Sequence, residues 1–77
     1  MFMHTVTFET KYTFGQCVRF DSRMQGRSGT GTIFAITLDV EGNIDYMISI
    51  IDEAGYSHLQ PGIYEHEIIE VLGPVEK

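Results

Sequence analysis

Cysteine is nearly absent from this chain, and that shortage narrows what can stabilise the fold. Cys17 is the only cysteine among 77 residues, so no disulfide can form within the chain. No Cys/Cys or Cys/His spacing of a structural zinc site is present either. A chain this short has one domain, over residues 1–77, and its stability must come from a closed sheet or from partners.

The sequence also lacks long runs of apolar residues and long runs of polar residues. No apolar run approaches the roughly 20 residues of a membrane span, and Met1–Glu9 is too short and too polar for a signal peptide. There is no long polar tract, and an apolar content of 43% argues against disorder. We therefore expect a soluble cytoplasmic protein that does not associate with membranes.

Positive charge is scarce and unevenly placed. The net charge is −6. Lys11, Arg19, Arg23 and Arg27 fall in one short stretch, whereas every charged residue from Ser28 to Glu76 is acidic. This distribution indicates a basic loop on an acidic body.

Alternating apolar and polar residues predict β-strands. Phe2, His4, Val6 and Phe8 alternate with threonine and other residues, which predicts a strand over Met3–Glu9. A second strand is expected over 17–21, with Val18 and Phe20 facing the core, followed by a mobile loop over 22–29. The strongest prediction is a hairpin of 30–38 and 44–51 around the turn Asp39-Val40-Glu41-Gly42-Asn43.

The remaining residues predict turns and a closing strand. Turns are expected at 52–56 and at Gln60-Pro61-Gly62, because proline cannot donate to a strand ladder. A short strand over 63–65, a helical turn over 66–68 and a final strand over 69–72 complete an all-β domain of five to six antiparallel strands.

Both faces of the central hairpin carry apolar side chains. Ile33 opposes Phe34 in the first strand, and Ile48 opposes Met47 in the second. A small barrel has only one interior, so the second face needs a cover. The cover is either the N-terminal strand or a second copy of the chain, and we expect a homo-oligomer.

No arrangement of catalytic or metal-binding residues emerges. Cys17 has no histidine or aspartate partner at a predictive spacing. His58, Glu65, His66 and Glu67 are ligand-type residues without the spacing of a metal motif. We expect no enzymatic activity, no metal and no cofactor.

The assembled motifs resemble SH3-like barrel modules. The chain has Phe14-Gly15-x-x-Val18, then Gly29-x-Gly31-x-Ile33 after a long first loop, and Glu65-x-x-Ile68 before the last strand. The resemblance covers 14–71 and implies a small SH3-like barrel with one short 3-10 turn near the C-terminus, to which residues 3–9 add a strand. In its compactness, the chain also resembles small proteins of phages, prophages and mobile gene cassettes.

A narrower resemblance is to the plasmid-encoded type II dihydrofolate reductases. Phe14-Gly15-x-x-Val18-Arg19, the Glu41-Gly42 turn and Ile63-Tyr64 are similar to that family's opening strand, hairpin and pore strand. Pro61-Gly62 replaces the family's Val-Gln, Gln60 is out of register by two residues, and Thr37 replaces a lysine. The resemblance implies the barrel and oligomerisation, without the reductase activity.

We expect a non-enzymatic, self-associating interaction module with a protein partner. The first candidate binding surface is Arg19, Arg23 and Arg27, and the second is an aromatic rim of Tyr46, Tyr56 and Tyr64. Nucleic-acid binding is an alternative, because the glycine-rich run 26–31 lies among these arginines. Mimicry of nucleic acid by the acidic surface is another.

Overall fold

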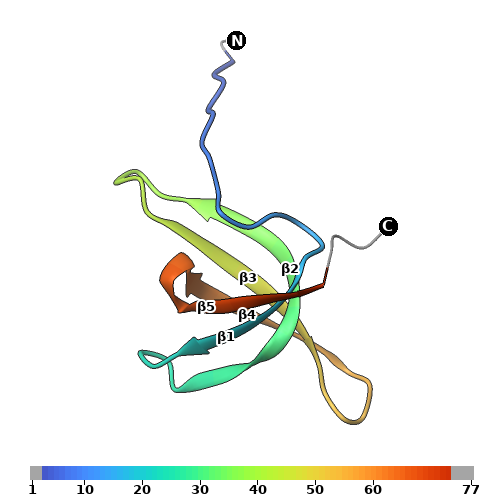
Figure 1. Cartoon of the computed structure of the whole chain (residues 1–77). Coiled ribbons are helices and arrows are strands. Elements are labelled where there is room, and N and C mark those ends of the chain that lie inside the picture. The colour runs from blue at the N-terminus through green and yellow to red at the C-terminus, as the bar shows by residue number, and fades with distance from the viewer. Residues whose placement is uncertain (1–2, 74–77) are drawn as a thin grey trace.

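The computed structural model describes residues 3–73 as five strands and one 3-10 helix (Figure 1). The elements, in chain order, are β1 (Cys17–Ser22), β2 (Arg27–Leu38), β3 (Ile44–Ile51), β4 (Ser57–Tyr64), η1 (Glu65–Glu67) and β5 (Ile68–Gly73). The all-β class and the single 3-10 turn predicted from the sequence are confirmed. Phe2, expected on the apolar face of the first strand, lies outside the described residues.

The strands form one antiparallel sheet in the order β4-β3-β2-β1-β5. The 3-10 helix η1 reverses the chain after β4, and β5 then pairs with β1 (Figure 1). Within residues 3–73 no ladder joins β4 to β5, so these two strands are the edges of an open sheet. Closure into an SH3-like barrel stays a prediction.

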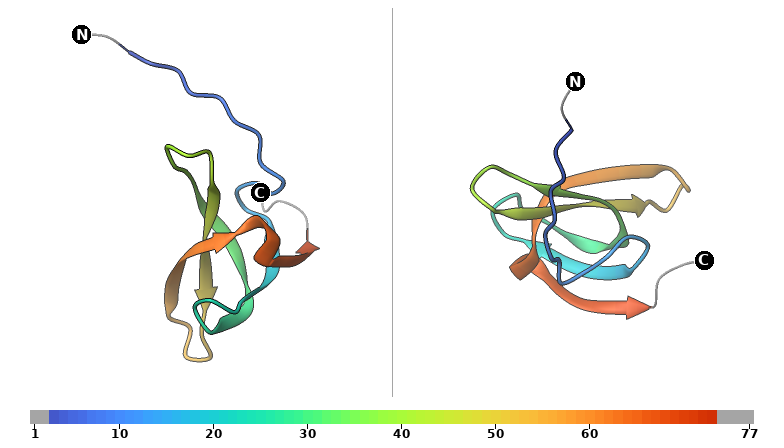
Figure 2. Two further views of the ribbon diagram at one scale, coloured as in Figure 1. Left: turned by 90° about the vertical axis from the view of Figure 1, so that its left-hand side faces the viewer. Right: turned by 90° about the horizontal axis from the view of Figure 1, so that it is seen from above.

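The sheet is strongly curled (Figure 2). Its buried apolar residues form one small core. Val18 and Phe20 of β1 are buried, as the alternation predicted. The other core residues come from the four remaining strands and from the segment before β1. They are Tyr12, Ile33, Tyr46, Ile48, Ile63 and Ile68.

The predicted central hairpin is formed by β2 and β3. Its turn is organised by Asp39, whose Oδ1 accepts hydrogen bonds from the backbone N–H groups of Glu41 at 2.9 Å and Asn43 at 2.8 Å. A β-bulge between Ile33 and Ala35 places Phe34 outward. The second face of the hairpin therefore keeps exposed apolar groups.

The prediction of a long loop over 22–29 is wrong. β1 ends at Ser22, β2 begins at Arg27, and a four-residue turn joins them, with the Gly26 N–H donating to the Arg23 carbonyl at 3.3 Å. Gly26 has a φ of 65°, a conformation that glycine adopts without strain. Ser22, Ser28 and Gly29, which indicated a loop, instead lie in paired strands.

The prediction of a turn at Gln60-Pro61-Gly62 is also wrong. These residues lie inside β4, where the register with β3 shifts between Tyr46 and Ile48. One extra residue on β4 makes a bulge, which is a position that accepts both proline and glycine in a strand.

The N-terminal strand expected over 3–9 is not formed. These residues belong to no strand, and they extend away from the sheet in Figures 1 and 2. An isolated strand has no partner for its backbone donors and acceptors, so the alternating pattern alone does not produce a ladder.

Candidate functional site

The turn between β1 and β2 presents Met24 to solvent. Met24 is 83% exposed, although its neighbour Gln25 is tied to β4. The Gln25 Nε2 donates to the carbonyls of Pro61 at 3.2 Å and Gly62 at 3.0 Å, and its Oε1 accepts a hydrogen bond from Gln60 Nε2 at 2.7 Å. The turn is therefore fixed against the β4 bulge while its methionine remains free.

Three adjoining hollows surround Met24. The first, of about 430 Å³, lies between Met24, Tyr64 and the turn residue Gly42. The second, of about 330 Å³, lies between Met24, Tyr64 and Pro61. The third, of about 240 Å³, has Met24 and His66 in its wall. We call these three hollows together the Met24 groove.

A buried carboxylate supports the wall of the Met24 groove. Glu67 is only 6% exposed, and its Oε2 accepts a hydrogen bond from Ser22 Oγ at 2.9 Å. Its Oε1 accepts one from the Tyr64 backbone N–H at 2.9 Å. The Tyr64 ring in turn stacks on His66, with centroids 5.9 Å apart and planes 4° apart. The backbone of Tyr64 is therefore anchored to Glu67, and its ring has a stacking partner in His66.

A second carboxylate joins η1 to the core and to the N-terminal segment. Glu65 Oε2 accepts hydrogen bonds from the Lys11 backbone N–H at 2.8 Å and from Tyr46 Oη at 2.5 Å. These bonds hold the pKa of Glu65 below its ordinary value. Burial, together with the hydrogen bond to Glu65, raises the pKa of Tyr46 to about 12.

The three arginines of the first candidate surface lie apart. Arg19 Nη2 pairs with Glu70 Oε1 of β5 at 2.6 Å, in a solvent-exposed position where such a pair stabilises little. Arg23 lines the third hollow of the Met24 groove. Arg27 lines a different hollow, beside His58 and outside that groove. The structure thus distributes these cations over different surfaces.

The three tyrosines of the second candidate surface do not form a rim. Tyr46 is 0% exposed and belongs to the core. Tyr56 precedes β4 and Tyr64 ends it, so at a rise of about 3.3 Å per residue they lie more than about 20 Å apart along the strand. Of the three, only Tyr64 lines the Met24 groove.

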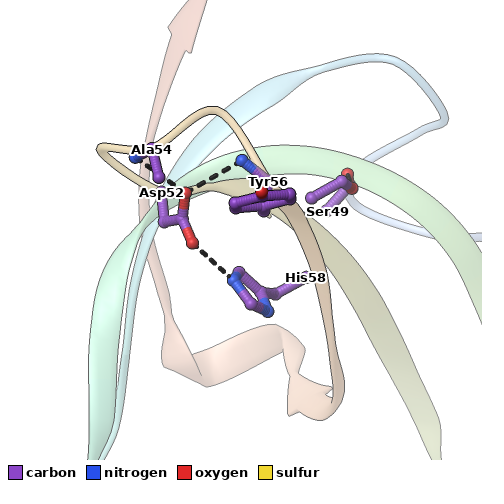
Figure 3. A network of polar contacts seen from close by, with 6 residues as sticks. Ser49, Asp52, Ala54, Tyr56 and His58 are labelled. Carbon is purple, nitrogen blue, oxygen red and sulfur yellow. Dashed lines mark hydrogen bonds and ion pairs between the residues drawn. The ribbon is translucent and has the colours of Figure 1, made fainter.

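An acid–imidazole pair lies at the turn between β3 and β4 (Figure 3). Asp52 Oδ2 and His58 Nε2 are 2.7 Å apart, and Asp52 Oδ1 accepts the backbone N–H groups of Ala54 and Tyr56 at 2.9 Å each. The His58 contact, together with these N–H groups, lowers the pKa of Asp52. The aspartate therefore organises the turn.

The hydroxyl groups near this pair are not aligned for nucleophilic chemistry. Ser49 Oγ and Ser57 Oγ hydrogen-bond to each other at 3.3 Å, and within residues 3–73 no hydrogen bond joins either of them to His58. Over the same residues, no group of three His, Cys, Asp or Glu side chains is placed to hold a metal ion. Nor does this part of the chain include a helix with the length and apolar character of a membrane span.

Comparison with protein-family models, curated proteins and solved structures finds no match for this chain. The site is therefore defined by its geometry. Gln60, the glutamine nearest in sequence to the position of the reductase pore amide, has its side chain buried against Gln25.

Sequence reasoning did not identify the Met24 groove. Met24 was visible as the one apolar residue in a segment rich in glycine, serine and arginine. The position of Met24 in a groove depends on Gln25, whose hydrogen-bond partners lie 35 to 37 residues away in the chain. Only the folded register brings that turn beside Pro61 and Tyr64.

Proposed function

We propose that the chain is a non-enzymatic binding domain and that its ligand occupies the Met24 groove. The proposal rests on one observation: Met24 is exposed on a turn that Gln25 fixes to β4. Methionine adapts its shape and is common on surfaces that bind peptides, while a fixed backbone lowers the entropy cost of binding.

The chemistry of the groove favours an extended peptide with apolar and basic side chains. Met24, Tyr64 and Pro61 offer apolar and aromatic contact, and the backbone of Tyr64 is held by its hydrogen bond to Glu67. Glu65 adds an ionised carboxylate in the first hollow. A lysine or arginine of the ligand would pair with it.

The test begins with selection of 12-residue peptides from a random displayed library on the wild-type protein. We expect the selected peptides to combine an apolar residue with a basic one. Substitution of Met24→Ser or Tyr64→Ala should raise the Kd of a selected peptide at least about tenfold, as expected for a central interface contact.

Matched controls exist on another surface. Ile51 is 71% exposed and Tyr56 70%, and neither lines the Met24 groove. Ile51→Ser and Tyr56→Ala should leave the Kd unchanged. Equal losses in both sets of variants, or tighter and steeply salt-dependent binding of a single-stranded oligonucleotide, would contradict the proposal.

We also propose that the protein self-associates. Apolar side chains are exposed on the sheet and on the N-terminal segment, and on a small domain they favour association. They include Met3, Val6, Phe34, Ile51 and Leu59. Light scattering at micromolar concentration tests this, because a monomer mass would contradict it. An assay for dihydrofolate-dependent NADPH oxidation is expected to show no turnover.

A further inference from the structure

The N-terminal segment has the side-chain pattern of a strand but no partner in the chain. We call residues 3–9 the N-terminal arm. Val6 is 69% exposed, and Phe8 is exposed on the same side of the extended backbone. Within residues 3–73, no ladder involves the arm. The arm carries a single acid, Glu9, although the chain as a whole is strongly acidic.

The first half of β4 offers unpaired backbone groups to such an arm. The Asp52 N–H donates to the Tyr56 carbonyl at 2.9 Å, so these two residues form a hydrogen-bonded pair. Bonded and non-bonded pairs alternate along an antiparallel ladder. Ser57 and Leu59 therefore direct their N–H and C=O groups outward, and the register is regular from Ser57 to Gln60.

The second half of β4 and the opposite edge strand, β5, are less suited to strand addition. In the second half of β4, Pro61 has no donor, and Gln25 Nε2 takes the carbonyls of Pro61 and Gly62. β5, the opposite edge, has two register shifts against β1 within its six residues, and bulges of this kind disrupt strand addition. The regular, uncovered edge is the segment Ser57–Gln60.

Apolar contacts and charge at this edge match the arm. Leu59 and Ile51 are exposed on one face of the β3–β4 pair, where Val6 and Phe8 of an added strand could pack. Arg27 lines a hollow of about 750 Å³ together with Leu59. In the described residues Arg27 makes no ion pair. It could therefore pair with Glu9, which lies on the opposite face of the arm from Phe8.

We propose that the N-terminal arm of one copy adds as a strand to the Ser57–Gln60 edge of a second copy. Val6 and Phe8 cover Leu59 and Ile51, and Glu9 pairs with Arg27. This inference rests on the proposed self-association and states its mode. The arm makes no ladder in its own chain, so pairing requires no internal strand to be released.

Sedimentation equilibrium of the full chain from micromolar to millimolar concentration measures the association. The wild type should reach a dimer or higher mass. Val6→Asp should weaken association at least about tenfold. Phe8→Pro should weaken it more than Phe8→Ala does, because Phe8 shares the face of Val6 and its backbone N–H would point to β4 in the added strand. Val40→Asp, at an exposed residue in the β2–β3 turn, should have no effect.

A charge exchange tests the placement of the arm. Glu9→Arg and Arg27→Glu should each weaken association severalfold, and the double variant should recover most of the loss. Amide hydrogen exchange supplies a second readout: the N–H groups of Ser57 and Leu59 should be protected in the associated state and become unprotected in Val6→Asp.

The outcomes separate the two proposals. A wild type that is monomeric at micromolar concentration overturns self-association and the arm together. Association that survives Val6→Asp and Phe8→Pro overturns the arm alone. Protection of Ser57 and Leu59 in the monomer would show that the arm folds back on its own chain, and failure of the charge exchange would exclude the Glu9–Arg27 placement.

Discussion

Tyr46 Oη donates a hydrogen bond to Glu65 Oε2 at 2.5 Å, linking a core tyrosine of β3 to the 3-10 helix that precedes β5. The same hydroxyl accepts the Tyr12 backbone N–H at 3.3 Å. One buried oxygen therefore fixes three segments that are distant in sequence, and the Met24 groove depends on their relative position because Glu65 lines it.

Tyr46→Phe should lower the free energy of unfolding by about 1 to 3 kcal/mol, because it leaves the Tyr12 N–H without its partner and removes one of the two hydrogen bonds that Glu65 accepts. Equilibrium unfolding in urea measures the change. Tyr56→Phe is the matched control: Tyr56 is largely exposed, so its stability should equal that of the wild type within error.

Glu65 should contribute to the loss of stability in acid. Its pKa is lowered in the folded state, so the unfolded chain binds the proton at higher pH, and the contribution is present above about pH 4.3 and lost as the pH falls through the folded value. Glu65→Gln should reduce the drop in urea midpoint between pH 7 and pH 3. An unchanged drop would show that Glu65 is not coupled to folding.

Gly31→Ala should destabilise the sheet by about 1 to 3 kcal/mol through overpacking. A Cβ on Gly31 would lie 2.5 Å from Ile48 Cγ2 and 2.5 Å from the Ser49 carbonyl oxygen, so β2 and β3 would have to separate. Gly73→Ala meets nothing within 4 Å and serves as the control in thermal unfolding.

Gln25→Ala should release the β1–β2 turn and leave the Gln60 amide, which is buried, with one partner fewer. The expected cost is about 1 to 2 kcal/mol of unfolding free energy. Peptide affinity for the Met24 groove should fall with it. Gln16→Ala removes a side-chain bond at an exposed position, to the Thr13 N–H, and should change neither quantity appreciably.

The parts of the fold that could be predicted from sequence were those governed by local alternation. Val18 and Phe20 alternate with more exposed neighbours, and this two-residue period predicted β1. Asp39 and Gly42 are residues that favour a tight turn, and they predicted the β2–β3 hairpin. The η1 turn was placed within one residue of its position.

The errors arose where the same residues suit two local structures. Pro61 and Gly62 are typical of turns, yet they also suit a bulge in an edge strand. Gly29 indicated a loop, whereas it lies in β2 and pairs with Phe20 of β1. Only pairing across the sheet separates these alternatives, and a single sequence does not display that pairing.

The candidate site was harder to predict for the same reason. Tyr46 and Tyr64 are equivalent as sequence letters, but β-sheet register buries one in the core and places the other at the groove. The arginines at 19, 23 and 27 are close in the chain, yet the turn between β1 and β2 points them toward different neighbours.

The bulge at Pro61 and Gly62 divides β4 into two working surfaces, with the Met24 groove beside Tyr64 and the uncovered edge beside Ser57. One copy can therefore hold a peptide and receive an arm at the same time. If both proposals hold, a dimer joined by two arms would be bivalent, with its two grooves at a set spacing. A ligand that carries two copies of the recognised motif on a linker of matching length should bind it far more tightly than either motif alone.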